Sequence, residues 1–172
     1  MTGQAKIDNG NQNSIHETLS NKLTEDKYDV LIYDHGSGEV ADFISFKEYP
    51  DKIEITLYHV KGSSGNKPGD RVNDVYDVCM QAIKSQVWAI NKVTFKNKIM
   101  SRTNKYNEKF IAGDIGLVNT LMNKVKRADF IFSIVQPGIS QDTFSPKLSY
   151  TLAATDDSLR SNGYAPLIAI GS

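Results

Sequence analysis

Three strand-like segments, separated by two short turns, constrain the fold of this 172-residue chain more than any other feature. The segment at 28–34, "YDVLIYD", is a short apolar and β-branched run, and "EVADFISF" at 39–46 and "IEITLYHVK" at 53–61 alternate apolar with polar residues. Alternation with a period of two is typical of strands that bury one face. Turn-forming residues, "HGSG" and "YPDK", separate the segments. The pattern predicts an antiparallel meander with one buried face.

Helical and further strand-like segments surround this predicted meander. Apolar residues at three- and four-residue steps predict helices over 14–23, 70–90, 114–128 and 145–163. Strands are predicted over 91–99, 129–138 and 165–172. No linker divides the chain, so we expect one mixed α/β domain over residues 14–172, preceded by a loose polar arm at 1–13.

The composition is that of an ordinary globular domain. Hydrophobic residues make up 40% of the chain, charged residues make up 23%, and the formal net charge is zero. The single cysteine, Cys79, cannot form an internal disulfide, which fits a reducing compartment. The sequence has no apolar run of about 18 residues and no apolar signal-peptide core near its start. We therefore expect a cytoplasmic protein without a membrane partner.

Charged and polar side chains interrupt the apolar faces of two predicted strands. Alternation places Asp42 on the apolar face of the second strand, and His59 and Lys61 at the end of the apolar face of the third. A charge on a buried face is costly unless it is paired or binds something. Because the strands are predicted to be antiparallel, these three side chains should meet at one end of the sheet, bordered by Glu39 and Asp34.

This set of residues suits metal-dependent cleavage of phosphodiester bonds. Carboxylates would hold a divalent ion, Mg²⁺ or Mn²⁺, and a lysine would stabilise charge on the reacting phosphate. The expected metal ligands are Asp42, His59, Glu39 and Asp34.

The same layout resembles the PD-(D/E)xK nuclease superfamily: a helix, a meander with an aspartate on its second strand, an acid-x-Lys tripeptide on its third, and another helix. Asp42 matches the aspartate, and His59-Val60-Lys61 matches the tripeptide with histidine in place of the acid. Gln81 lies where many members carry a helical glutamine, and Glu17 could match an acid on the first helix. The resemblance implies a restriction-endonuclease-like core in which Asp42, His59, Lys61 and Gln81 are catalytic. A neutral imidazole suits Mg²⁺ poorly, so the site could prefer Mn²⁺, use Glu39 or Asp34, or be inactive.

A narrower resemblance covers most of the chain, including "YDVLIYDHGSGEVADFISF" and "VNDVYDVCMQAIKSQVW". These stretches are similar to C-terminal segments of large bacterial DEAD/DEAH-type helicase proteins. The resemblance implies a nucleic-acid substrate, DNA rather than RNA, a helicase domain or subunit as partner, and a role in defence or restriction. The oligomeric state stays open, with a homodimer as one option.

A basic block lies in the middle of the sequence. Residues 84–127 contain ten basic and two acidic residues, interleaved with aromatic side chains. Such a stripe suits a phosphate backbone, and its expected contacts are Lys96, Lys98, Arg102 and Lys105. The alternative is a solvated hairpin face.

Three other interpretations use the same residues. Asp42 and Lys61 could form a structural ion pair between neighbouring strands. The stretch "HVKGSSGN" partly fits the H-x-K-x4-D pattern of phospholipase D-like enzymes, although Asn66 replaces the aspartate. The chain could also be a binding or docking module that keeps the nuclease fold without the chemistry. A metal-dependent cleavage assay separates the enzyme from the docking module.

Overall fold

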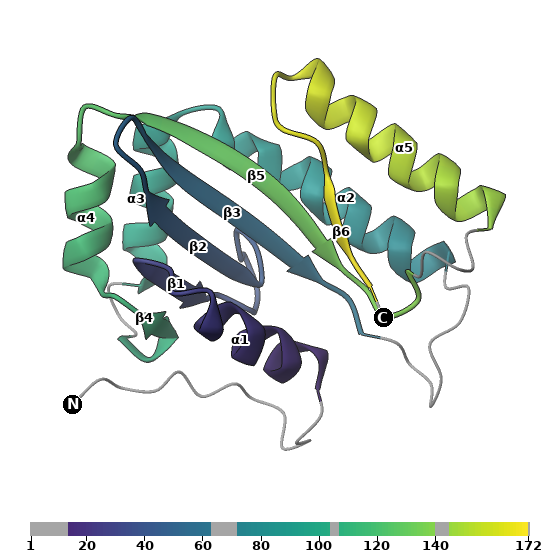
Figure 1. The fold of residues 1–172 in the computed structure, drawn as a ribbon, viewed down its shortest axis with the longest axis horizontal. Coiled ribbons are helices and arrows are strands. Elements are labelled where there is room, and N and C mark those ends of the chain that lie inside the picture. Colours follow the sequence, from purple (N-terminus) through teal and green to yellow (C-terminus); the bar gives the residue numbers. More distant parts are fainter. Residues whose placement is uncertain (1–13, 63–71, 104–106, 140–144, 172) are drawn as a thin grey trace.

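The computed structural model describes residues 14–62, 72–103, 107–139 and 145–171. It shows an α/β fold built on one mixed six-stranded sheet with the order β4-β1-β2-β3-β5-β6 (Figure 1). The strands are β1 (Val30–Tyr33), β2 (Phe43–Glu48), β3 (Lys52–Val60), β4 (Phe110–Ala112), β5 (Arg127–Val135) and β6 (Ile168–Ile170). The helices are α1 (Ile15–Glu25), α2 (Val72–Ala89), α3 (Lys92–Thr103), α4 (Ile115–Asn123) and α5 (Pro146–Ser161), with a 3₁₀ turn at Asn107–Lys109.

The predicted meander is present and forms the antiparallel half of the sheet. β1 pairs with β2 and β2 pairs with β3, both antiparallel. β5 then lies parallel to β3 along its whole length, and β6 lies parallel to β5. β3 is therefore the central strand that joins the antiparallel half to the parallel half.

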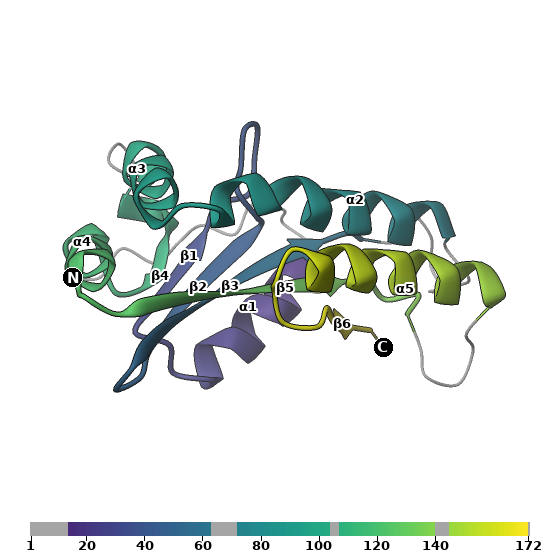
Figure 2. The same ribbon diagram turned by 90° about the horizontal axis from the view of Figure 1, so that it is seen from above.

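Helices cover both faces of the sheet, so both faces of the meander are buried and not only one as expected. Figure 2 shows α1 on one side and α2, α3 and α5 on the other. Leu19 and Leu23 of α1 pack on Leu31 and Phe43. The opposite face carries a larger core in which sheet residues pack against α2, α3, α4 and α5. The strands alternate between two apolar layers, as sheets covered on both faces do.

The pairing register assigns each strand residue to one of these layers. Phe43 pairs with Tyr58 on the α1 side, and Ile44 pairs with Leu57 on the α2 side. The alternation predicted for β3 is thus confirmed. His59 follows Leu57 on the α2 side of the sheet, where its side chain is 2% exposed.

The predicted second strand was wrong at its start. β2 begins at Phe43, and the expected strand residues before it belong to a loop at 34–42. Gly36 and Gly38 in this loop have φ of 131° and 75°, values that favour glycine. Because the loop turns the chain before β2, Asp42 does not follow the alternation of the strand.

The strand predicted over 91–99 is also wrong, because this segment lies in α3. Phe95, Ile99 and Thr103, spaced one helical turn apart, are its buried residues. Asn91 begins the helix, and its Oδ1 accepts hydrogen bonds from the backbone N–H of Val93 and Thr94 at 2.8 and 3.2 Å. The cap and the four-residue spacing outweigh the strand preference of Val93 and Thr94.

The segments around α4 and β4 also differ from the prediction made from the sequence. The helix predicted over 114–128 ends at Asn123, and β5 already begins at Arg127. The edge strand β4, which pairs with β1, was not predicted. Among the residues described, none of the helices combines the length and the apolar character that a membrane span requires.

Candidate functional site

Asp42 is the buried carboxylate at the centre of the candidate site. It lies at a bend immediately before β2 and is 1% exposed. The backbone N–H of Val60 donates a hydrogen bond of 2.7 Å to Asp42 Oδ2. Val60 is the middle residue of the His-x-Lys tripeptide, so one short hydrogen bond joins the predicted aspartate to the predicted tripeptide.

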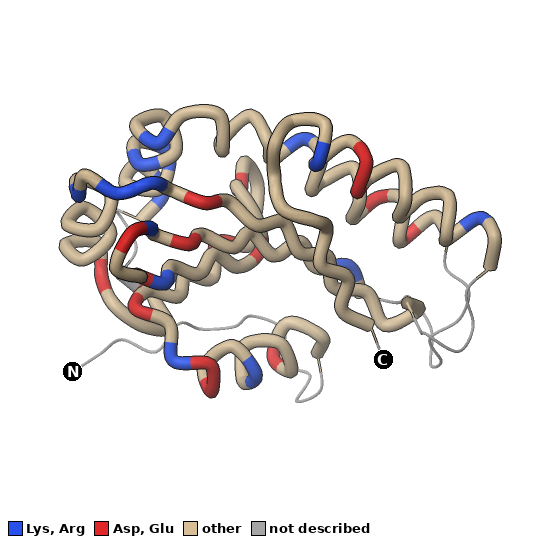
Figure 3. The backbone as a smooth tube through the Cα atoms, turned by 45° about the horizontal axis from the view of Figure 1, so that its top comes forward, with Lys and Arg blue, Asp and Glu red and all other residues tan. Residues whose placement is uncertain are grey.

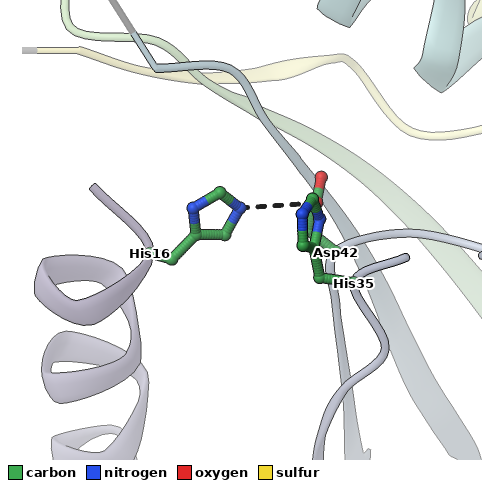
Figure 4. A group of neighbouring side chains, drawn as sticks. All are labelled: His16, His35 and Asp42. Atoms are coloured by element: carbon green, nitrogen blue, oxygen red, sulfur yellow. Dashed lines mark hydrogen bonds and ion pairs between the residues drawn. The ribbon is translucent and has the colours of Figure 1, made fainter. Parts of the chain in front are cut away.

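Two histidines approach the other oxygen of this carboxylate. Asp42 Oδ1 lies 2.6 Å from His35 Nδ1 and 3.4 Å from His16 Nε2. His16 comes from the first turn of α1, and His35 comes from the loop between β1 and β2 (Figure 4). Burial alone would raise the pKa of Asp42, but hydrogen bonds from His16, Val60 and His35 together hold that pKa below its usual value. Asp42 is therefore ionised at neutral pH.

Glu39 is a second carboxylate beside this group. Its Oε2 accepts a 2.6 Å hydrogen bond from Gly36 N–H and lies 3.5 Å from His35 Nδ1. Burial raises the pKa of Glu39, the Gly36 hydrogen bond lowers it, and the negative charge of Asp42 raises it further. Glu39 is thus placed, as predicted, near Asp42, and it holds a proton more readily than an ordinary glutamate.

Asp34 is held by basic side chains and not directed at Asp42. It is 1% exposed, and Arg102 Nε donates to its two carboxylate oxygens at 2.8 and 2.6 Å. Lys109 Nζ forms a further ion pair with Asp34. Arg102 also donates to the carbonyl oxygens of Asp34 and Ser37, at 3.2 and 3.1 Å. Asp34 and Arg102 therefore fasten the loop at 34–42 to α3, a structural role that the sequence analysis did not assign to either residue.

His59 lies on the α2 side of the sheet. Its Nε2 lies 2.9 Å from Ser85 Oγ, and Ser85 in turn donates to the carbonyl oxygen of Ala82. Burial lowers the pKa of His59 to about 4, although the negative charge of Asp42 partly opposes the shift. The imidazole is therefore neutral at pH 7, braced against α2.

Lys61 and Gln81 lie at the same junction of β3 and α2. Lys61 Nζ pairs with Asp77 Oδ2 at 3.2 Å, and both side chains are partly exposed. Gln81 lies one helical turn after Asp77 and one before Ser85, and its Oε1 is buried without a hydrogen-bond partner within the described structure. Because residues four apart share a helix face, Asp77, Gln81 and Ser85 present one polar stripe beside the end of β3.

The structure therefore divides most of the predicted catalytic and metal-binding residues into two adjoining groups. Asp42 and Glu39 gather with His16 and His35, whereas His59, Lys61 and Gln81 gather along α2. The Val60 hydrogen bond connects the groups. The ion pair considered between Asp42 and Lys61 is replaced by one between Lys61 and Asp77.

Three of the four residues predicted to contact nucleic acid have side chains that contact other residues of the protein. Lys96 Nζ donates to Asn123 Oδ1 at 2.7 Å, and Lys98 Nζ lies 4.8 Å from the centre of the Trp88 ring. Arg102 is engaged with Asp34, as described above. Lys105 lies outside the described residues. The basic block is helical over α3, so the hairpin geometry of the alternative prediction is wrong, and its solvated face would be a helix face.

Sequence reasoning missed both His16 and His35. The chain contains only three histidines, and the one that was singled out, His59, lies apart from this pair. The adjacent Glu17, considered as a family match, instead donates its backbone N–H to the Ser14 cap. A useful signal was the position of His35 inside the acid-rich loop at 34–42, together with a histidine in the first turn of a helix predicted to cover the sheet.

Comparisons with protein-family models, curated proteins and solved structures found no match to this chain. The interpretation of the site therefore depends on its own geometry. A buried ionised carboxylate with imidazoles on one oxygen, and a lysine at the end of the adjoining strand, can hold a cation and contact an anionic substrate.

Proposed function

We propose that this domain is a metal-dependent phosphodiesterase that cleaves nucleic acid, with Asp42 and Lys61 at the centre of its active site. One observation carries the proposal: the Val60 N–H, between His59 and Lys61, donates to Asp42 Oδ2 at 2.7 Å. This hydrogen bond joins the carboxylate directly to the backbone of the His-x-Lys tripeptide at the end of β3. The resemblance to PD-(D/E)xK nucleases implies that these neighbouring residues act together.

The donor atoms around Asp42 fit a divalent cation. Asp42 offers an ionised oxygen already approached by two imidazoles, and Glu39 adds a carboxylate beside them. When bound, such an ion would stabilise negative charge that develops on a phosphate and lower the pKa of the attacking water.

The chain's own groups would act around that centre. Lys61, whose side chain is 38% exposed, can leave the partly exposed Asp77 at little cost and contact a phosphate oxygen. Glu39, with its raised pKa, can accept a proton from water and hold it. His59 remains neutral and braces β3 against α2, and the buried Gln81 Oε1 has a free capacity to accept a hydrogen bond within the described structure.

The basic residues and the resemblance to helicase-linked segments extend the proposal. We infer that the substrate is DNA rather than RNA and that a helicase domain or subunit delivers it, in the cytoplasm. Lys96 and Lys98 of α3 would contact the phosphate backbone.

The direct test is cleavage of end-labelled single- and double-stranded DNA and RNA, with and without chelator, in Mg²⁺, Mn²⁺ or Zn²⁺. We expect metal-dependent cleavage of DNA by the parent protein. Lys61→Ala should reduce cleavage by about 100-fold or more, with little loss of nucleic-acid affinity, because the contact acts on the reacting phosphate. Lys147→Ala, at an exposed lysine of α5, is the matched control and should cleave like the parent.

Three results would contradict this assignment in different ways. If the parent protein cleaves none of the substrates with any of the ions, the phosphodiesterase proposal is wrong. If it binds nucleic acid without cleaving it, the docking module is favoured. Equal cleavage by Lys61→Ala and the parent would remove Lys61 from catalysis. Cleavage that survives chelator would favour the metal-independent phospholipase D-like chemistry.

A further inference from the structure

His16, His35 and Asp42 form a compact cluster of potential metal ligands, and their chemistry indicates which class of ion the site would bind. The three ligand atoms, His16 Nε2, His35 Nδ1 and Asp42 Oδ1, all lie within 4.8 Å of one another. Neighbouring ligands of a tetrahedral zinc ion are about 3.3 Å apart, given bonds of about 2.0–2.2 Å. The 3.4 Å separation of His16 Nε2 from Asp42 Oδ1 already matches this spacing. His35 Nδ1 lies 2.6 Å from Asp42 Oδ1 and within 4.8 Å of His16 Nε2. Binding an ion at this spacing therefore requires the His35 ring to move away from Asp42 Oδ1 by less than about 1 Å and to stay within reach of His16.

We propose that His16, His35 and Asp42 form a two-histidine, one-carboxylate site for a zinc-class transition-metal ion, and that this site does not select Mg²⁺. This inference deepens the proposed function, because it names the cation of the same active site. Its ligand set differs from the expected one: the imidazoles are His16 and His35, and His59 is not among them.

The chemistry of the donors decides the class of ion. Imidazole nitrogen suits zinc, copper, iron and nickel, whereas Mg²⁺ prefers six oxygen ligands and keeps much of its water. Two imidazoles and one carboxylate are also a ligand set of catalytic zinc sites, which keep a further position open. The exposure of the side chains leaves such an opening, because the His35 side chain is 47% exposed whereas those of His16 and Asp42 are 13% and 2% exposed.

The surroundings hold these ligands in place before an ion arrives. The Val60 N–H fixes Asp42 Oδ2 and leaves Oδ1 directed at the two histidines (Figure 4). Tyr33 stacks on His35, with ring centres 6.0 Å apart and planes at 22°, and packs edge-on against His16 at 5.9 Å. Outer contacts of this kind orient metal ligands and affect affinity for the metal.

Glu39 lies beside His35, the most exposed of the three ligands. Its Oε2 lies 3.5 Å from His35 Nδ1, so it stands at the edge of the cluster and outside the three-ligand group. A carboxylate in this position can become a fourth ligand or accept a proton from water. Both roles fit a catalytic site better than a closed structural one, in which four ligands from the protein surround the ion.

The test uses Co²⁺ as a spectroscopic substitute for Zn²⁺, with the 172-residue chain and no nucleic acid. We expect visible absorption bands of four- or five-coordinate Co²⁺ to saturate at one equivalent, and Zn²⁺ to abolish them by competition. A large excess of Mg²⁺ should leave the bands unchanged. His16→Asn and His35→Asn should each weaken Co²⁺ affinity by more than the roughly 10- to 100-fold that loss of an outer contact causes.

The third histidine provides the matched control. His59→Gln removes an imidazole that contacts Ser85, so this variant should bind Co²⁺ like the parent. Thermal unfolding of each variant without metal shows whether a loss of Co²⁺ binding comes from a loss of folding. The His35→Asn variant should disturb the fold least, because the His35 side chain is partly exposed.

The outcomes separate this inference from the proposed function. Zinc-class binding that depends on His16 and His35 would support the site even if no nucleic acid is cleaved. Three results would overturn it: no Co²⁺ bands in the folded parent, loss of binding in His59→Gln but not in His16→Asn or His35→Asn, or displacement of Co²⁺ by Mg²⁺. If the protein cleaves nucleic acid with Mg²⁺ but fails to bind Co²⁺, the result would support the phosphodiesterase proposal and contradict the zinc-class site.

Discussion

At the scale of single residues, His59 shows how burial sets the chemical character of a side chain. The sequence presents His59 and Lys61 as two polar groups on one strand face, but their environments differ strongly. His59 is 2% exposed and contacts Ser85, whereas the Lys61 side chain is 38% exposed and pairs with Asp77. A neutral imidazole in the first position keeps β3 packed on α2, and a charged, partly free ammonium in the second can contact an anion.

The lowered pKa of His59 predicts a specific pH dependence of stability. Its pKa is about 4 in the folded protein against an ordinary 6.5, so between these values the unfolded chain binds the extra proton. The free energy of unfolding is therefore expected to fall with pH from about 6.5 to about 4, and this histidine's share of the loss is about 3 kcal/mol. Above and below that pH range, His59 does not change the free energy of unfolding with pH.

The measurement is urea unfolding across that pH range, in parallel for the parent and His59→Gln. Glutamine retains a side-chain partner for Ser85 but does not titrate, so the difference between the two proteins isolates the histidine. The variant should show a shallower fall in unfolding free energy with decreasing pH. Equal slopes in both proteins would mean that His59 is not a buried neutral imidazole.

At the scale of elements, the loop at 34–42 depends on α3 for its position. Asp34 in the loop is fully buried and is held by Arg102 from α3 and by Lys109. The same loop carries His35 and Glu39 and ends at Asp42. Positioning of the candidate site is therefore shared between the meander and a helix that lies far along the chain.

Removing Arg102 should therefore destabilise the protein. We expect Arg102→Ala to lower the free energy of unfolding by about 2 kcal/mol, because it leaves a buried carboxylate with one cationic partner in place of two. Arg160→Ala, which breaks an exposed pair with Asp156, should cost no more than about 1 kcal/mol. Chemical unfolding of both variants checks this, and equal small losses would show that Arg102 does not hold the loop.

Long, strongly patterned elements could be predicted from the sequence, and short or irregular ones could not. The meander, α1, α2 and α5 follow from clear periods of two or about 3.6. α3 was mistaken for a strand, because only two of its buried residues, Phe95 and Ile99, are apolar. β4 has three residues, too few to show a period.

The site was predictable only in part, for a related reason. Asp42 and the His-x-Lys tripeptide could be related to each other because antiparallel pairing brings the start of β2 beside the end of β3. His16 and His35 join Asp42 through a glycine-containing loop and a helix that packs across the sheet. Such contacts between elements leave no periodic signal in the sequence.

At the scale of the whole molecule, the formal charge of zero conceals an uneven distribution. Figure 3 shows Lys and Arg gathered along α3 and near the start of β5, whereas Asp and Glu are spread over several elements. Part of the basic charge is already engaged, since Lys124 and Lys126 both pair with Glu48. The lysines of α3 thus remain the main candidates for contact with a phosphate backbone.

The expected consequence is a salt-dependent affinity for nucleic acid. Replacing Lys96 and Lys98 with Ala should weaken binding to all sequences alike, and it should flatten the slope of log affinity against log salt by up to about 2 on duplex DNA. A salt titration of binding compares the double variant with the parent. The double variant Lys22→Ala, Lys147→Ala, which removes two exposed lysines elsewhere, is the control for total charge. An unchanged slope in Lys96→Ala, Lys98→Ala would show that nucleic acid docks elsewhere or not at all.

The position of the site along the chain has a consequence for the order of folding. His16, His35, Asp42 and the Val60 N–H all belong to α1 and the meander, which are contiguous in sequence. The parallel pairing of β3 with β5 joins residues as distant as Lys52 and Arg127, so it requires closure of a much longer stretch of chain. Local contacts form faster than distant ones. We therefore expect the cluster of His16, His35 and Asp42 to assemble before β5 pairs with β3. An ion bound at that stage would link α1 to the meander before the parallel half of the sheet forms.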